Sequence, residues 1–215
     1  MKTSYSKFLD RLVCVLTVFF VLDRLLKLAT VVHFFSRSPA TVPAKWSGIT
    51  LFQPITRGVS GLSASLRSRA RLNYPSSIQH LLICDVHDSE SLAECRALQA
   101  EFPSLQAEII QVEAPGGAVA KKTEKLLAAI PHATGEVFWF LDDDVALRPG
   151  AARLMIPDLN QSNVGAVFGL ACYTNWRTLW SSLMSMFVNA NALLRLFYRW
   201  AHLLKIVVAK NPGKA

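Results

Sequence analysis

Short apolar runs alternate with helical segments between residues 48 and 141, and this alternation limits the fold more than any other feature of the chain. The apolar runs are rich in Ile, Leu, Val and Phe and have the length of buried strands. The predicted strands are 48–55, 80–85, 107–112 and 137–141, and the predicted helices between them are 62–72, 89–102 and 121–129. Strands that alternate with helices in this way form βαβ units. The sequence therefore predicts an α/β fold with a mostly parallel sheet and flanking helices.

Acidic residues stand at the ends of two of these predicted strands. Asp85 ends the second strand, and three consecutive aspartates, Asp142, Asp143 and Asp144, follow the fourth. Open α/β sheets bind ligands at the edge formed by the carboxyl ends of their strands. In a chain with a formal net charge of +8, these carboxylates are candidate ligand-binding groups. The alternative is a solvated turn, which explains most acidic pairs in loops.

The chemistry of the aspartate turn favours a hard cation. Three adjacent carboxylates repel one another unless a cation neutralises them. Asp142 and Asp144 are therefore candidate ligands of Mg²⁺ or Mn²⁺, which proteins hold with one or two carboxylates and substrate phosphates. The EF-hand pattern and the HExxH pattern of zinc sites are both absent. A nucleotide diphosphate bridged by a metal suits this arrangement, because the ion stabilises the leaving phosphate.

The N-terminal stretch 12–35 is apolar and long enough, as a helix, to cross about 30 Å of hydrocarbon. Asp23, Arg24 and Lys27 lie at its centre, and each lone charge there costs roughly 2.5–3.5 kcal/mol. Asp23 and Lys27 have the i,i+4 spacing of an ion pair and can offset each other. We predict a membrane anchor helix over residues 1–36, with an interfacial or re-entrant helix and a cleaved signal as alternatives. A polar, Pro-containing linker follows at 37–47.

Charge and apolar residues elsewhere also suggest a membrane. The aromatic and aliphatic residues after Trp176 predict an amphipathic helix at a membrane interface, with packing against the sheet as the alternative. The basic residues are scattered and lack an aromatic platform, so we predict no nucleic-acid partner. Positive charge beside apolar segments suits an anionic membrane face. The four cysteines lack CxxC and framework spacing, which indicates reduced thiols. We expect a membrane protein, single-pass or interfacial, with its main domain in the cytoplasm.

Six motifs from Gly48 to about Leu194 carry a resemblance to a known family. They are QPITRG (53–58), NYP (73–75), CDVHD (84–88), KTEKLLAAIPHATGE (122–136), LDDDVALRPG (141–150) and VGAVFGLACY (164–173). In this order they resemble motifs of the inverting GT-A glycosyltransferases, particularly the membrane-bound ceramide glucosyltransferase type and its bacterial hopanoid-associated relatives. The last motif resembles the strand that follows the family's DxD motif.

The resemblance implies a GT-A, Rossmann-like domain over residues 48–175 that uses a UDP-sugar donor. The implied reaction is an inverting, metal-assisted transfer of a sugar, with glucose the first choice, to the hydroxyl of a ceramide- or hopanoid-like lipid. The implied nucleotide-sugar-binding residues are Pro54, Asp85, Lys122 and Asp142. Asp142 and Asp144 would hold Mn²⁺ or Mg²⁺.

The sequence also departs from the family pattern. Lys125 replaces an Asn of the family, so no role is carried over to it. The third acidic motif, which holds the general base, and the (Q/R)xxRW motif are not found, and RLFYRW (195–200) has one residue too many. An inverting transfer needs a base, which we expect beyond the C-terminus of this chain. Residues 176–215 would then be an interface helix and a truncated tail. The alternative is a truncated or split chain that binds the nucleotide sugar without catalysis.

Two further motif matches are weaker. A strand followed by DxD also resembles the haloacid-dehalogenase phosphatases, whose first Asp is a nucleophile. Ala146 stands where that pattern expects Thr or Val, and the phosphatase is the less favoured alternative. GGAVAKKT (116–123) departs from a P-loop because Lys121 takes the place of the second glycine.

Overall fold

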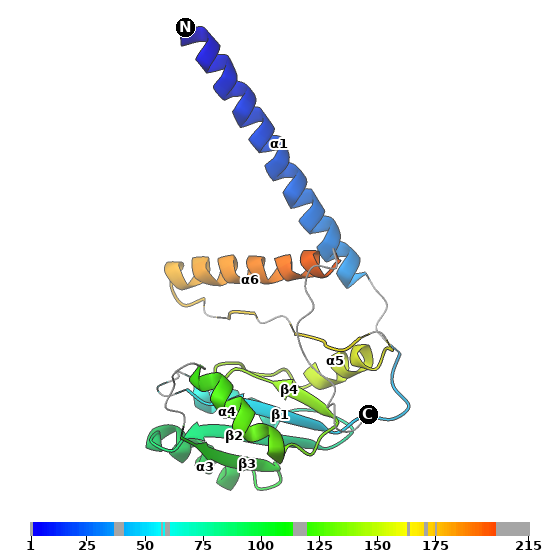
Figure 1. The fold of residues 1–215 in the computed structure, drawn as a ribbon, viewed down its shortest axis with the longest axis vertical. Coiled ribbons are helices and arrows are strands. Elements are labelled where there is room, and N and C mark those ends of the chain that lie inside the picture. The colour runs from blue at the N-terminus through cyan, green and yellow to red at the C-terminus, as the bar shows by residue number, and fades with distance from the viewer. Residues whose placement is uncertain are drawn as a thin grey trace. The chain divides into compact units, whose positions relative to one another are not determined.

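The computed structural model describes residues 2–36, 41–56, 58, 61–113, 120–162, 164–169, 172–174 and 176–200. The described elements fall into two compact units. One contains two helices, α1 (Lys2–Phe35) and α6 (Leu179–Trp200), and the other contains the sheet with its covering helices (Figure 1).

A single parallel sheet forms the centre of the second unit (Figure 1). Its strands are β1 (Ile49–Pro54), β2 (Ile78–Asp85), β3 (Ala107–Val112) and β4 (Val137–Phe140). Their order is β3-β2-β1-β4, so β1 lies between β2 and β4. Ile49 is aligned with Ile78 on one side and with Val137 on the other. The predicted α/β class with a parallel sheet is confirmed.

Most helices of this unit also match the prediction. α3 (Ser89–Glu101) and α4 (Lys121–Ala129) lie within one residue of the predicted ranges, and α2 (Leu62–Arg69) ends three residues before the predicted end at 72. The sequence pattern did not predict α5 (Ala151–Leu159) or the short 3₁₀ helix Ile130–His132. α5 contains Pro157, a residue that normally indicates the end of a helix.

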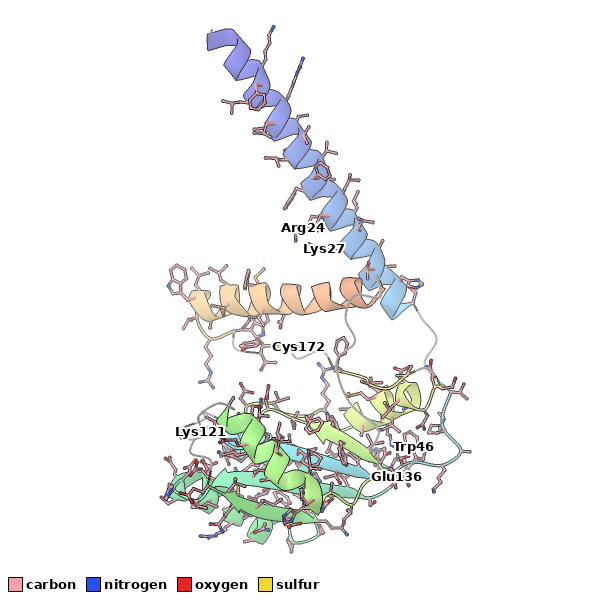
Figure 2. All side chains as sticks on the ribbon, in the orientation of Figure 1. Arg24, Lys27, Trp46, Lys121, Glu136 and Cys172 are labelled. Carbon is pink, nitrogen blue, oxygen red and sulfur yellow. The ribbon has the colours of Figure 1, made fainter. Side chains whose placement is uncertain are left out.

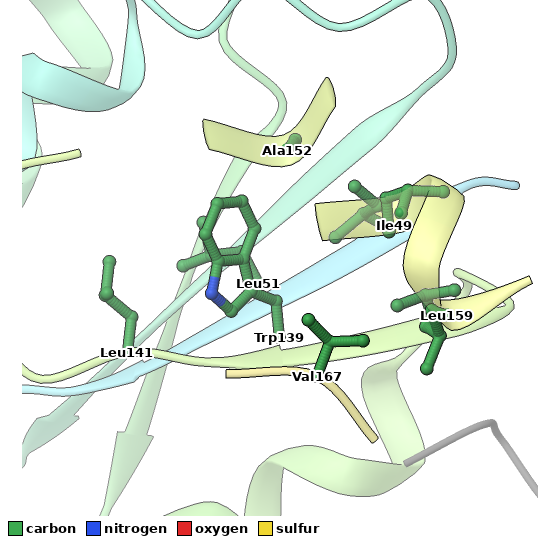
Figure 3. Packing of buried hydrophobic residues seen from close by; sticks show 9 residues of the cluster. Ile49, Leu51, Trp139, Leu141, Ala152, Leu159 and Val167 are labelled. Atoms are coloured by element: carbon green, nitrogen blue, oxygen red, sulfur yellow. The ribbon is translucent and has the colours of Figure 1, made fainter. Parts of the chain in front are cut away.

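Alternate strand residues face opposite sides of the sheet, and both sides are covered. On one side, Ile49, Leu51 and Trp139 pack with α5, and Figure 3 shows the Trp139 ring close to Ala152 and Val167. On the same side, α2 and α3 pack against the ends of β1 and β2. The buried side chains of this cluster are Ile55, Leu62, Leu66, Leu82, Cys84, Leu92, Cys95 and Leu98. On the opposite side, Phe52, Leu81, Ile83 and Phe138 pack with Ala129 of α4. Burial on both faces explains the near-continuous apolar strands.

The segment 164–173, which resembles a strand in sequence, is not a strand at residues 164–169 or 172–173. Val167 is nevertheless buried in the core beside Trp139. Val167, with the partly buried Val164, therefore contributes to core packing and not to strand pairing.

α1 is helical as predicted, but among the described residues no helix is long and apolar enough to cross a membrane. Asp23, Arg24 and Lys27 interrupt the apolar stretch of this helix. The predicted pairing of these charges is confirmed, with Lys27 Nζ 2.5 Å from Asp23 Oδ2. Arg24, labelled with Lys27 in Figure 2, lies 3.4 Å from the same oxygen and 4.8 Å from the centre of the Phe20 ring.

The interface helix predicted within residues 176–215 corresponds to α6, and residues 201–215 of that range lie outside the described residues. Large apolar side chains of α6 are exposed. They include Trp180, Leu183, Met184 and Phe187, whose spacing places them on one face of the helix. Along α1, consecutive residues from Val18 to Leu22 are exposed, so apolar side chains occur on all its sides.

Candidate functional site

The candidate site lies at the edge of the sheet where all four strands end. Asp85 ends β2 and the aspartate turn follows β4, so these acidic groups flank the end of β1. The chain places β2 and β3 on one side of β1 and β4 on the other. Open α/β sheets have a ligand-binding crevice at such a switch in strand order. α4 follows β3 and begins at the same edge, where Figure 2 labels Lys121.

Two residues singled out from the sequence, Lys122 and Asp142, meet at this edge. Lys122 Nζ donates a hydrogen bond to Asp142 Oδ1. The Lys122 side chain is 53% exposed and the Asp142 side chain 57%, so water screens the pair and its net contribution to stability is small. Both side chains are therefore able to exchange this partner for a ligand.

The three aspartates of the turn differ in burial. Asp142 and Asp144 are exposed, whereas Asp143 is only 9% exposed. Asp143 Oδ2 accepts a hydrogen bond from the Thr56 N–H at 2.5 Å. The backbone turns at this point, and the Val145 N–H donates to the backbone oxygen of Asp142 at 3.4 Å. Asp143, which the sequence left without a role, attaches the turn to the end of β1.

Gln53 and Ser65 also hold the aspartate turn, and sequence reasoning missed both. Gln53 Nε2 donates to the backbone oxygen of Asp142 at 3.0 Å and to Ser65 Oγ at 3.2 Å. Ser65 Oγ donates to the backbone oxygen of Val145 at 2.8 Å. The signal in the sequence was Gln53 itself, a long polar residue within a mostly apolar strand.

Sequence reasoning also missed Lys125. It lies one turn after Lys122 on α4 and is only 7% exposed. Its Nζ donates to the backbone oxygen of Ile55 at 2.7 Å. A buried ammonium group needs such a partner, because burial of an unpaired charge is strongly unfavourable. The sequence signal was the lysine in place of the family's asparagine.

Asp85 is a half-buried carboxylate at the end of β2. Its Oδ1 accepts the His87 N–H at 3.0 Å, and this hydrogen bond is the main reason that the pKa of Asp85 is lowered. The positive charges of Lys125 and Lys121 lower the pKa further, against the effect of burial. Asp85 is therefore a stable acceptor for hydroxyl or N–H groups of a ligand. Pro54, by contrast, is buried beside Ile83.

The residues of the turn are chemically suited to a divalent cation. Among the described ranges, no group of three or more His, Cys, Asp and Glu side chains is placed to hold a metal. Mg²⁺ and Mn²⁺ need fewer protein ligands when substrate phosphates complete the coordination. Asp142 and Asp144 provide two exposed carboxylates at one turn, and their hard oxygen donors fit such an ion.

Another group of titratable side chains is buried on the face of the sheet covered by α2 and α3. Arg69 is 1% exposed, and none of its guanidinium nitrogens has a hydrogen-bond partner among the described residues. Burial lowers the pKa of Arg69 to about 9. Burial, and then the charge of Arg69, lower the pKa of His80 to about 3. The free thiols of Cys84 and Cys95 lie 3.6 Å apart on the same face.

The chain is similar to known glycosyltransferases in sequence and in fold. The family model of glycosyl transferase family 21 matches residues 12–208. A solved structure, the mannosyltransferase PcManGT from Pyrobaculum calidifontis in complex with GDP-Man and Mn²⁺, is similar with a TM-score of 0.52 and 19% sequence identity. The similarity covers 76% of this chain and 48% of that one, so the chain spans about half the length of the mannosyltransferase. This likeness supports a GT-A-like fold. A comparison with curated proteins gives no match.

Proposed function

This chain belongs to glycosyl transferase family 21, and from that membership we propose that it moves a sugar from a UDP-sugar to the hydroxyl group of a membrane lipid. Glucose is the proposed sugar, and a ceramide- or hopanoid-like lipid is the proposed acceptor, because the motifs resemble those of ceramide glucosyltransferases. The observation that carries the proposal is the meeting of Lys122 with the aspartate turn at the switch in strand order.

The charges at this edge match a nucleotide diphosphate with a divalent cation. In the proposed complex, Asp142 and Asp144 hold Mn²⁺ or Mg²⁺, and Lys122 turns from Asp142 to the diphosphate. A divalent ion there supplies positive charge to the leaving diphosphate. The N-terminus of α4, with its positive dipole end, faces the same negative group. Asp85 accepts hydrogen bonds from the ribose or the uracil.

Isothermal titration calorimetry of UDP in the presence of Mn²⁺ tests this proposal. We expect the wild-type chain to bind UDP more tightly with Mn²⁺ than without it. Asp144→Ala should weaken Mn²⁺-dependent UDP binding at least about tenfold, because it removes one of two carboxylate ligands of a hard cation. Asp158→Ala on α5, which removes a carboxylate outside the site, is the matched control and should bind as the wild type does. Unchanged binding by Asp144→Ala would contradict the metal role.

Turnover distinguishes the proposed transferase from its alternatives. The purified protein, assayed with a panel of UDP-sugars and a lipid extract, should form a glycolipid and release UDP. Metal-dependent UDP binding without transfer would instead support a chain that binds the nucleotide sugar but does not catalyse transfer. Hydrolysis of a phosphomonoester without any sugar nucleotide would support a phosphatase.

We also propose that the helical unit lies at a membrane interface, with the sheet domain on the cytoplasmic side. The exposed apolar side chains of α1 and α6 support the interface, since such surfaces are rarely left in water. The four free cysteines suit a reducing compartment. This location would bring a lipid acceptor to the same protein that holds the soluble donor.

A further inference from the structure

One peptide group at the end of β1 is bound by two buried charged side chains. The carbonyl oxygen of Ile55 accepts a hydrogen bond from Lys125 Nζ at 2.7 Å. The N–H of the same peptide unit, which belongs to Thr56, donates to Asp143 Oδ2 at 2.5 Å. Lys125 and Asp143 are both less than 10% exposed. A cation and an anion therefore bind opposite ends of a single peptide dipole.

This arrangement is stronger than two ordinary hydrogen bonds. Hydrogen bonds to charged groups are shorter and about twice as strong as neutral ones. The cation polarises the carbonyl and the anion polarises the N–H, so each contact strengthens the other. The peptide also compensates two charges that would each be unfavourable when buried alone. We call the Lys125–peptide–Asp143 arrangement the peptide clamp.

The peptide clamp joins the same two elements as the exposed Lys122–Asp142 pair. Lys125 follows Lys122 by three residues on α4, and Asp143 follows Asp142 in the turn. The same two elements, α4 and the aspartate turn, are thus joined twice. The exposed pair has to open when a ligand takes either partner, whereas the buried clamp is shielded from the ligand and from water.

We propose that Lys125 and Asp143 are positioning residues, which hold α4 and the aspartate turn at a fixed spacing when the donor and its cation occupy Lys122, Asp142 and Asp144. This inference rests on the proposed function, because it assigns the clamp to the same nucleotide-sugar site. Neither residue touches the donor. Their effect on binding passes through the peptide Ile55–Thr56 to the residues that do.

A double-mutant cycle tests the inference with two near-isosteric neutral replacements, Lys125→Met and Asp143→Asn. Each variant and the double variant are compared by urea unfolding without metal, and by calorimetric titration with UDP in the presence of Mn²⁺. Lys45→Met and Asp158→Asn are matched controls, because they remove the same charges at positions outside the site. Lys125→Arg keeps the positive charge and tests whether charge alone is sufficient.

We expect the urea midpoint and the affinity for UDP with Mn²⁺ to respond differently to the double substitution. Each single variant leaves one buried charge without its opposite and should lower the urea midpoint, whereas the double variant should recover part of that loss. UDP–Mn²⁺ binding should be weakened about tenfold in both single variants and remain weakened in the double variant, because the spacing is lost in all three. Lys125→Arg should bind more tightly than Lys125→Met. Should the single variants not fold, the double variant and Lys125→Arg still provide the comparison.

Wild-type affinity in the double variant would overturn the positioning role and leave the clamp as a purely structural feature. Binding that recovers in step with stability would have the same meaning. If the wild-type chain does not bind UDP with Mn²⁺, this result contradicts the proposed function. The positioning role is then contradicted as well. The urea cycle would then still show whether the two charges are coupled.

Discussion

Asp142, Asp143 and Asp144 are chemically identical, yet their side chains have different surroundings. The outer two are exposed at the carboxyl edge of the sheet, and the middle one binds the Thr56 N–H. The sequence predicted the outer pair as a unit because adjacent carboxylates favour a hard cation and because the segment resembles the DxD motif of the family. It could not predict the partner of Asp143, which lies 87 residues away in sequence and is brought close only by the pairing of β1 with β4.

His80 should make the stability of the fold depend on pH. Its pKa is about 3 in the folded chain, against an ordinary value near 6.5 in the unfolded chain. Above pH 6.5 both states are neutral. As the pH falls from 6.5 towards 3, only the unfolded chain takes up the proton, so stability is lost at up to about 1.4 kcal/mol per pH unit.

Urea unfolding at pH 7.5 and pH 5.5 measures this effect. The wild type should lose about 1 kcal/mol more than His80→Gln between these two pH values. His87→Gln, which changes an exposed histidine, should lose as much as the wild type does. An equal loss in His80→Gln and the wild type would show that the buried imidazole does not account for the pH dependence.

At the scale of elements, the hydrophobic pattern was sufficient to predict the position of a strand or helix where its apolar residues recur with a regular period. The four strands and α3 and α4 lie close to their predicted positions for this reason. The pattern failed where tertiary packing overrides local preference. α5 contains an internal Pro157 and is stabilised by packing of Ala152 and Ile156 against β1 and β4. The segment around Val167 is apolar because it packs into the same core, and not because it forms a strand.

Gly135 should tolerate no side chain, because it lies against the backbone of β1. A Cβ atom at this position would be 2.5 Å from Thr50 N and 2.6 Å from the carbonyl carbon of Ile49. Gly135→Ala should therefore destabilise the fold by about 2–3 kcal/mol, as overpacked sites do. Gly150→Ala is the control, since no atom lies within 4 Å of its added Cβ. Urea unfolding of both variants is the measurement, and equal midpoints would contradict the close approach of Gly135 to β1.

On the scale of the whole molecule, two units with different surfaces share one chain. The sheet unit buries its apolar side chains on both faces, whereas α1 and α6 leave theirs exposed. The sequence predicted the apolar character of both helices. It also predicted the pairing of Asp23 with Lys27, but not the contact of Arg24 with the same carboxylate oxygen, which depends on side-chain conformation.

Binding to lipid vesicles should depend on the exposed face of α6. Trp180 is 79% exposed, and Phe187 lies on the same face. Replacing both by alanine should weaken binding to vesicles of phosphatidylcholine and phosphatidylserine about tenfold or more, because each large apolar side chain contributes about 1.5–3 kcal/mol when buried. Leu154→Ala on α5 removes a side chain that is 75% exposed in the other unit and should bind as the wild type does. Sedimentation with vesicles provides the measurement, and equal binding by all three proteins would exclude α6 as the contact.

Lys125 and Asp143 meet only through a backbone group, which every sequence possesses whatever residue stands at position 55. A change at either position alone leaves the other buried charge without an opposite charge. A change of both positions to neutral residues leaves no buried charge. Across homologous chains, positions 125 and 143 are thus expected to covary, lysine accompanying aspartate, even though no side-chain contact links them. A search for coevolving pairs that considers only touching side chains would find no structural reason for this one.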